Sequence, residues 1–588
     1  MTAPAACAPD SVRLTWAQPE DLVGHELRQA AEDGRNPEPA RRTWLAAGGG
    51  PAPDRDGASP TPAAPELRAL AVGLLDELAA QTSPLAAAEP QPWKAIVAAC
   101  PDWPPPPAPA AEQHPVDPAG PDRAPTGHEP SPHPAAPATT HDPARTGHDA
   151  QRRPRATGQD RDPGGPTPHS PGSPAAQDPD PAGHRSASRP GAAAAQHREP
   201  GGHGLSVHPA TPAGHDPRTR PEAARQDRPD ADAPAGQDLR TRLEAAWLGR
   251  AVGCLLGKPV EKLPLEGIRA LARATGNWPL NDWFSARGVP PEVLAAHPWN
   301  RRSAPTSLAE NIDGMPEDDD LNYPLLGLLL LQRHGKGFTT ADVARLWLDE
   351  LPAGRTFTAE RIAYRNLLLG LEPPATATHH NPFREWIGAL IRADVHGWTN
   401  PGDPAAAAAQ AYRDAVLTHT GNGVYAALFI AAATAEAATG RADVHTALRA
   451  GLAVVPPRSR LAEAVRLGIR AASDEADFDL VVDRLHARFG HYHWVHAIPN
   501  TALIAAALTH ADGDFTRSVC RAVSGGWDTD SNGATAGALA ALVAGSPGAL
   551  PHRWTAPLKN RLATTVPGFD GIGFDTLAHL TAQEAARS

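Results

Sequence analysis

The segment from about Pro101 to Gln237 most limits what this chain can fold into. Pro, Ala, Gly, His, Asp and Arg dominate it, and large apolar residues are almost absent. Such a segment cannot bury enough apolar surface to offset its conformational entropy, so we predict a disordered, partly polyproline-II linker. The chain of 588 residues therefore divides into an N-terminal part (1–100), the linker (101–237) and a region (238–588) large enough for a sizeable core.

Residues 238–588 carry an all-α pattern. Helical spacing of apolar residues recurs in Ala-rich segments, whereas strand-like alternation is scarce and the connections are mostly short. The predicted helices lie around 340–350, 358–371, 383–396, 404–416, 423–439, 442–453, 459–473, 478–488, 500–510, 515–523 and 534–544. We expect these residues to form one all-α domain.

Residues 1–100 are predicted to form a partly ordered appendage on this bundle. Helical spacing over Pro19–Glu32 and Pro65–Gln81 predicts two helices, and the second carries a stripe of leucines. The piece is small and is interrupted by Gly48-Gly49-Gly50-Pro51, which argues against an independent domain. We expect its leucines to cover apolar surface of the helical bundle.

Charge and cysteine content exclude several classes of protein. The formal net charge of -12 at pH 7 argues against a nucleic-acid-binding surface and against a basic membrane-binding patch. Cys7, Cys100, Cys254 and Cys520 have no C-x-x-C spacing, so we predict neither a disulfide framework nor a cysteine zinc site. No signal-peptide pattern or membrane-spanning apolar run is present. We expect a cytoplasmic monomer with no nucleic-acid or membrane partner.

An acidic stretch lies just before the predicted helix at 534–544. Asp528, Asp530 and Ser531 fall in the turn-prone residues 525–533, and hard oxygen donors of this kind suit Mg²⁺, Mn²⁺ or Ca²⁺. An EF-hand is excluded because Leu539 occupies the twelfth loop position, where a bidentate Glu is required. The plainer alternative is a helix N-cap, with acids near the positive end of the helix dipole.

A second acidic stretch, Glu317-Asp318-Asp319-Asp320, stands directly before the strongly apolar residues 321–331. Four consecutive acids at the start of a buried helix repel one another unless solvent or a cation compensates them. Facing each other across one pocket, the two helix starts would hold a pair of metal ions.

A glycine-rich helix end is the third element. Gly249, Gly253 and Gly257 lie four residues apart on one helix face. They lower helix propensity, so they indicate that another backbone or a ligand approaches this face closely. Pro259 ends the helix and presents Glu261 in the following turn.

Together the three elements resemble the ADP-ribosylglycohydrolase family, in particular dinitrogenase-reductase-activating glycohydrolases. Gly253–Glu261 is similar to the family's G-D-A-x-G-x-P-x-E element, residues 317–320 to its [S/T]-D-D-[T] element, and Gly525–Gly537 to its G-G-D-x-D-[T/S]-x-G-A-x-x-G element. Their order and joint presence make the resemblance specific. The chain departs from the family pattern at four positions: Cys254 (often Asp), Glu317 (Ser or Thr), Asp320 (Thr) and an inserted Trp527.

Two further stretches agree with the family. Gly388–Arg392 looks like its G-A-x-M-R element, and Thr418–Tyr425 looks like its histidine-containing ligand loop. Read without the resemblance, Arg392 would be a surface cation and His419 an ordinary polar loop residue. The substrate-binding residues that the resemblance implies are Gly388, Arg392, His419, Asn422 and Gly423.

The resemblance implies that residues 238–588 form an orthogonal multi-helix bundle, the catalytic domain. It also implies an all-α hydrolase with two Mg²⁺ or Mn²⁺ ions that cleaves the glycosidic bond between ADP-ribose, or a related ribosyl group, and its acceptor. The acceptor would be a small molecule or a protein, so that the enzyme reverses ADP-ribosylation. The ions would hold ribose hydroxyls and lower the pKa of a water molecule. The implied metal ligands are Glu317, Asp318, Asp319, Asp528, Asp530 and Ser531, and the implied catalytic residues are Glu261, Asp318 and Asp319.

Other interpretations stay open at this point. Glu261 would act as an orienting or acid/base carboxylate, or would only bridge two helices. The protein would otherwise be a catalytically weak ADP-ribose-binding module, or a hydrolase of a small N-ribosylated metabolite. A zinc hydrolase that uses His491, His493 and His496 is the least favoured, because their spacing is not H-E-x-x-H.

Overall fold

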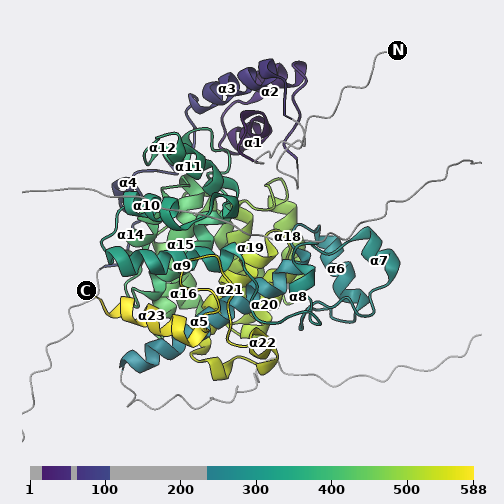
Figure 1. Cartoon of the computed structure of the whole chain (residues 1–588), viewed down its shortest axis with the longest axis vertical. Helices are drawn as coiled ribbons and strands as arrows, with labels where there is room; N and C mark the ends of the chain where they lie inside the picture. The colour runs from purple at the N-terminus through teal and green to yellow at the C-terminus, as the bar shows by residue number, and fades with distance from the viewer. Residues whose placement is uncertain (1–15, 54–61, 106–234, 588) are drawn as a thin grey trace, which may run out of the picture. The chain divides into compact units, whose positions relative to one another are not determined.

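The computed structural model describes residues 16–53, 62–105 and 235–587 (Figure 1). These residues form helices α1 to α23 and 3-10 helices η1 to η5, and they contain isolated β-bridges but no β-strand. The all-α prediction is therefore confirmed. Residues 106–234, which make up most of the predicted linker, lie outside the described residues. No helix in the described part of the chain is both long enough and apolar enough to cross a membrane.

The described residues before the linker are called the N-terminal segment (16–105), and those after it the helical body (235–587). The N-terminal segment contains α1 (Pro19–Glu32), α2 (Glu38–Ala46), α3 (Pro65–Ala79) and α4 (Trp93–Ala99). The body contains α5 (Ala235–Gly257), η1 (Lys258–Val260), α6 (Leu265–Ala274), α7 (Pro291–Ala296), α8 (Ala304–Ser307), α9 (Asp319–His334), α10 (Thr340–Glu350), η2 (Ala353–Arg355), α11 (Thr358–Leu368), α12 (Ala375–Thr378), η3 (Ile387–Arg392), α13 (Asp394–Trp398), α14 (Pro404–Ala415), α15 (Gly421–Ala437), α16 (Val444–Ala453), α17 (Arg460–Asp474), α18 (Phe478–Phe489), α19 (Ala497–Ala511), α20 (Phe515–Ser524), α21 (Thr529–Ala544), η4 (Pro547–Ala549), α22 (His552–Thr555), η5 (Ala556–Leu558) and α23 (Phe574–Ala586).

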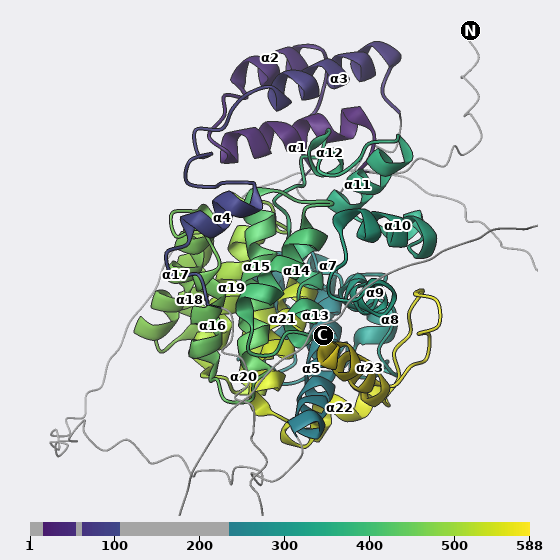
Figure 2. The ribbon, with the colours of Figure 1, turned by 90° about the vertical axis from the view of Figure 1, so that its left-hand side faces the viewer.

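The body is organised around α15. Every residue of this helix except Glu436 is buried, as expected for a helix that is apolar on all sides. It packs against α13, α14, α16 and α19, and Figure 2 shows it among these neighbours. Many of its residues are alanines, whose small side chains let surrounding helices approach closely.

The predicted close approach at the glycine face of α5 is confirmed, and the approaching group is the backbone of α21. A Cβ atom added to Gly253 would lie 1.8 Å from the carbonyl oxygen of Gly533, and one added to Gly249 would lie 2.3 Å from that of Gly537. Only glycine fits at such separations. The contact continues to Gly257, so the end of α5 lies beside the start of α21.

The predicted helix over 383–396 is wrong. The backbone is extended at Trp386 (φ -83°, ψ 177°), and only the short η3 and α13 follow. The Ile387 N–H donates to the Val495 carbonyl at 2.9 Å, and the Ala497 N–H donates to the Glu385 carbonyl at 3.0 Å. Pairing between these two distant segments, 385–387 and 493–497, outweighs local helix propensity. They are called the paired loops below.

The leucine stripe of the N-terminal segment packs within the segment, and its expected cover of the body stays a prediction. Leu74, Leu75 and Leu78 of α3 are buried, and α3 packs against α1 and α2. Part of the contact with the body is made by α1 and by Trp16, which lies before it. Trp16 and His25 meet the ring of Trp386 edge-on, with centroids 5.9 and 5.7 Å apart.

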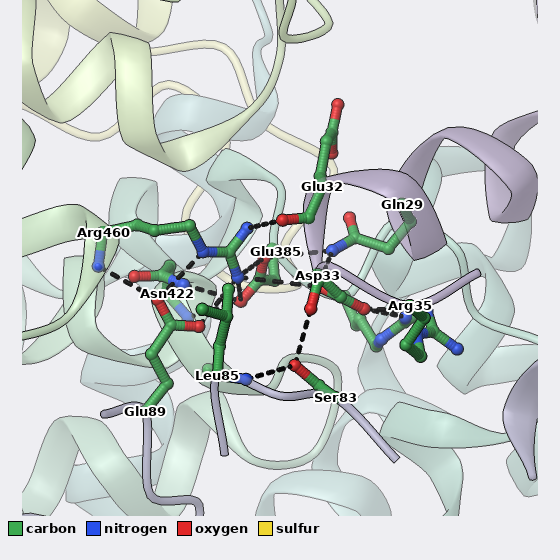
Figure 3. A network of polar contacts seen from close by, with 12 residues as sticks. Gln29, Glu32, Asp33, Arg35, Ser83, Leu85, Glu89, Glu385, Asn422 and Arg460 are labelled. Atoms are coloured by element: carbon green, nitrogen blue, oxygen red, sulfur yellow. Dashed lines mark hydrogen bonds and ion pairs between the residues drawn. The ribbon is translucent and has the colours of Figure 1, made fainter. Parts of the chain in front are cut away.

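A buried polar network joins the N-terminal segment to the body (Figure 3). Arg460 pairs with Glu89 at 2.8 Å and with Glu385 at 2.9 Å. Arg384 pairs with Glu26 at 2.7 Å and with Asp33 at 2.8 Å. The junction network, as it is called below, consists of Glu26, Gln29, Glu32, Asp33, Arg35, Glu89, Arg384, Glu385, Asn422 and Arg460. Its charged groups come from both sides of the junction, so neither side alone supplies the partners.

Candidate metal centre

The acids at the start of α9 begin as a helix cap. Asp318 is the N-cap residue, and its Oδ1 accepts a hydrogen bond from the Asp320 N–H at 3.0 Å. Asp319 and Asp320 lie in the first turn, where the helix dipole favours negative charge. The helix is buried from Asp320 to Leu331. Capping therefore accounts for Asp318, but not for Asp319 and Asp320. At the other helix start, Asp528 is the N-cap residue but its side chain makes no capping hydrogen bond.

The acidic stretch at residues 528–531 also lies at a helix start. Helix α21 begins at Thr529, earlier than expected, so that Asp530 and Ser531 fall in its first turn and Asp528 precedes it. The turn before it needs left-handed backbone at Gly526 (φ 80°) and at Trp527 (φ 57°). The ring of Trp527 stacks on His486 at a centroid distance of 3.9 Å, which holds the inserted tryptophan in place.

The end of α5 links the two helix starts. A Cβ atom on Gly257 would lie 2.4 Å from the backbone nitrogen of Asp530. The next residue, Lys258, forms an ion pair with Asp318 through its Nζ atom. Cys254, one turn earlier, places its sulfur within 4.8 Å of carboxylate oxygens of Asp318 and Asp320. The α5 end, the α9 start and the α21 start therefore meet in one place.

Burial and mutual repulsion dominate the electrostatics of this place. Burial, together with neighbouring carboxylates, raises the pKa of Asp319, Asp320 and Asp528 well above its usual range. Burial and the charges of Glu261 and Asp318 raise the pKa of Asp530 to about 7. Burial acts in the same direction on Asp318, but the Lys258 ammonium overcomes it and holds the pKa of Asp318 below its usual value.

The donor set fits a hard divalent cation. The buried Oδ1 of Asp530 has no hydrogen-bond partner. Within the described residues, no basic side chain forms an ion pair with Asp319, Asp528 or Asp530. Arg250 reaches Asp320 only at 3.4 Å, because its main partner is Asp394 at 2.6 Å. Buried carboxylate oxygens that lack a counter-charge suit Mg²⁺ or Mn²⁺.

Glu261 and Glu317 lie differently from the aspartates. The Glu261 carboxylate accepts from Asn300 at 2.8 Å and pairs with Lys262 at 3.1 Å. Its side chain keeps 19% exposure, and its charge acts on Asp528 and Asp530. Glu317 pairs with Arg355 at 3.0 Å, so metal ligation by Glu317 stays a prediction that requires this pair to open.

Arg392 lies in a closed polar cluster. It donates to Asp414 at 2.9 Å, to Glu360 and the Gly388 carbonyl at 2.8 Å, and to Thr418 at 2.7 Å. Its side chain is 2% exposed. The structure thus shows Arg392 holding η3, α11 and α14 together, and its contact with substrate stays a prediction.

The other expected substrate-binding residues are buried beside this cluster. Asn422 donates to Glu385 at 2.8 Å and accepts from the Leu461 N–H at 2.9 Å. His419 shares a hydrogen bond of 2.6 Å with Thr418. At Gly388 and Gly423 a Cβ atom would collide with Glu360 and with the Arg384 backbone. These positions are shaped by packing, and their substrate role also stays a prediction.

The three histidines at 491–496 do not converge on one point. His493 stacks on Trp386 at 4.3 Å, and His491 packs on Tyr492 at 4.2 Å. The ring of His496 instead faces Glu32 of the N-terminal segment. Among the residues that the structure describes, the one group of three potential ligand side chains is Cys254, Asp318 and Asp320. The zinc interpretation gains no support.

Sequence reasoning missed two residues of this centre. Lys258 lies within the motif that ends at Glu261, but nothing local indicates that it reaches Asp318. Asn500 of α19 accepts from the Asp528 N–H at 3.1 Å and from the Asn532 side chain at 2.7 Å. It carries no local signal, because its partners lie in a different helix.

The chain was compared with known protein families, curated proteins and solved structures. The profile of the ADP-ribosylglycohydrolase family matches residues 235–585. A solved structure described as an ADP-ribosylglycohydrolase-related protein complex matches with 22% identity and a TM-score of 0.37, over 59% of this chain and 98% of that chain. The comparison with curated proteins found no match. Because the family profile covers more than half of the sequence, the chain belongs to the ADP-ribosylglycohydrolase family.

Proposed function

We propose that this protein is a metal-dependent hydrolase that cleaves the glycosidic bond between ADP-ribose, or a related ribosyl group, and its acceptor. Membership in the family implies a glycohydrolase. The observation that carries the proposal is the group of buried aspartates at two helix starts, in which the Oδ1 atom of Asp530 is left without a partner. A structural role alone does not account for such a group, because unpaired buried carboxylates destabilise a fold.

The residues that would hold two ions are those at the two helix starts. Asp318 and Asp319 come from the α9 start and Asp528, Asp530 and Ser531 from the α21 start. When bound, Mg²⁺ or Mn²⁺ supplies Lewis acidity and lowers the pKa of a water molecule. Glu317 would join this set only after leaving Arg355, so we place it as an auxiliary ligand.

Glu261 is the proposed acid/base group. Hydrogen bonding from Asn300 and the ion pair with Lys262 orient its carboxylate, and it is partly exposed. In this position Glu261 would accept a proton from the attacking water. The neighbouring aspartates would stabilise the positive charge that develops on the ribose ring in an oxocarbenium-like transition state.

The test is release of free ADP-ribose from N-linked and O-linked ADP-ribosylated proteins, in Mg²⁺ and in chelator. Asp528→Ala and Asp530→Ala are compared with the wild type, and Asp512→Ala, which is 82% exposed, is the matched control. We expect metal-dependent release in the wild type and in the control, and none in the two variants. ADP-ribose binding without release from any of these substrates would identify a binding module and would overturn the proposal.

A further inference from the structure

The N-terminal segment, which lies outside the family match, contacts the body at the paired loops in three ways. Trp16 and His25 pack against Trp386 and, at centroid distances of 6.5 and 5.8 Å, against His493. Gln29 donates to the Glu385 carboxylate at 3.0 Å. Separate elements of the segment therefore converge on one small region, the paired loops 385–387 and 493–497.

The third contact involves His496, which is fully buried and is the N-cap residue of α19. Its Nδ1 accepts a hydrogen bond from the Ile498 N–H at 3.2 Å, so the ring proton of the neutral histidine is on Nε2. That Nε2 lies 3.5 Å from the Glu32 carboxylate and 3.9 Å from that of Glu385. A carboxylate of the N-terminal segment thus lies against the ring of the residue that starts α19.

From His496 the connection reaches the metal centre through one side chain. Asn500, in the first turn of α19, donates to the carbonyl oxygens of Trp494 and His496, both at 2.8 Å. Its Oδ1 accepts from the Asp528 N–H at 3.1 Å and from Asn532 at 2.7 Å. Every polar atom of the Asn500 side chain is thereby used to fix the paired loops relative to the start of α21.

We propose that the N-terminal segment is a positioning part of the metal centre, acting through Glu32, His496 and Asn500 on Asp528. The proposal rests on the proposed function in one respect: Asp528 is taken to be a metal ligand. Residues that orient a ligand typically change metal affinity when they are removed, even though they do not touch the metal. The segment would then be required for a correctly placed ligand as well as for the stability of the body.

The test measures Mn²⁺ affinity of the full-length protein from the electron paramagnetic resonance signal of free Mn²⁺, well below the melting temperature. We expect Asn500→Ala to weaken binding by roughly 10- to 100-fold and Glu32→Ala by a smaller factor. Glu32→Gln should keep near-normal affinity, because an amide of the same size still lies against His496 Nε2. In the double variant Glu32→Ala/Asn500→Ala, binding should be no weaker than in Asn500→Ala, since both act through Asp528.

The control is Asp76→Asn, which removes a different contact between the two parts, the ion pair of 2.8 Å with His380. It should leave Mn²⁺ affinity unchanged. Unchanged affinity in Glu32→Ala, or strictly additive losses in the double variant, would overturn the positioning role while leaving the proposed hydrolase standing. A wild-type protein that binds no Mn²⁺ would overturn the proposed function, and this inference with it.

Discussion

The molecule contains two buried charged groups, and they are built differently. In the junction network, Glu26, Asp33, Glu89 and Glu385 each accept hydrogen bonds from an arginine. At the metal centre the partners are fewer. Asp318 has Lys258 and Asp320 has a distant Arg250, whereas Asp319, Asp528 and Asp530 have no basic partner among the described residues.

The comparison shows how buried charge distinguishes structure from function. Carboxylates that are paired and hydrogen-bonded can be kept for the stability of the fold, because removing one partner leaves the other uncompensated. Carboxylates buried without partners cost free energy in every state that lacks a cation. The first arrangement is complete within the protein, whereas the second would need a bound cation to compensate its charge.

Removing a carboxylate from the metal centre should lower activity but raise the stability of the metal-free protein. We expect Asp530→Asn to lose activity on the order of a thousandfold, equivalent to about 4 kcal/mol, because a proposed ligand is lost. The melting temperature of the metal-free protein should rise, since an amide replaces a buried carboxylate without a counter-charge. Turnover and calorimetry in chelator check this, with Asp512→Asn as control; a lower melting temperature would contradict the comparison.

The opposite result is expected in the junction network. Arg460→Met should lower the free energy of unfolding by about 3–5 kcal/mol, because Glu89 and Glu385 lose their buried partner. Urea unfolding of the metal-free protein measures the change. The neighbouring Arg458 is exposed, and Arg458→Met should shift the free energy by less than about 0.5 kcal/mol. Equal effects of the two variants would show that the pairs are not structural.

Glu32 differs from the other acids of the junction network because its pKa is strongly raised. It should make the free energy of unfolding depend on pH. Burial and the charge of Glu385 raise its pKa to about 8. A folded-state pKa above the unfolded value gives stability that is complete near pH 4 and is lost as the pH rises toward 8. Glu32→Gln imitates the protonated form, so it should be more stable than the wild type above pH 8, on the order of 2–4 kcal/mol.

Thermal unfolding of the wild type and of Glu32→Gln between pH 5 and 9 checks this. Only the difference between the two proteins is informative, because other buried acids titrate in the same range. The difference should vanish near pH 5 and grow toward pH 9. A difference that is constant with pH would place the titration elsewhere.

The smallest effect is expected at Lys258, the ammonium group at the metal centre. Lys258→Met frees the Asp318 oxygen that now pairs with it, so Mn²⁺ should bind more tightly by roughly fivefold, equivalent to about 1 kcal/mol. The metal-free protein should become less stable, because Asp318 loses the cation that pairs with it. Lys559→Met, at an exposed ion pair, is the control in both measurements. Weaker Mn²⁺ binding in Lys258→Met would instead identify Lys258 as a support for the ligands.

Local signals predicted much of the fold, and their failures have physical reasons. The predicted range Pro19–Glu32 coincides with α1. The apolar residues there follow helical spacing because one face of the helix is buried. The glycine face of α5 was informative because only a close backbone contact explains it. The predicted helix at 383–396 failed because the paired loops form between distant segments, and no local pattern encodes such pairing.

The sequence by itself determined the all-α class, the family, and the two acidic helix starts, since each depends on residues close together in the chain. Only the tertiary structure decided which charges are compensated. The pairs Lys258–Asp318, Gln29–Glu385 and Asn500–Asp528 join residues from different elements. Whether a carboxylate is structural or awaits a cation depends on such partners, because Coulomb energy and desolvation depend on distance in space and not along the chain.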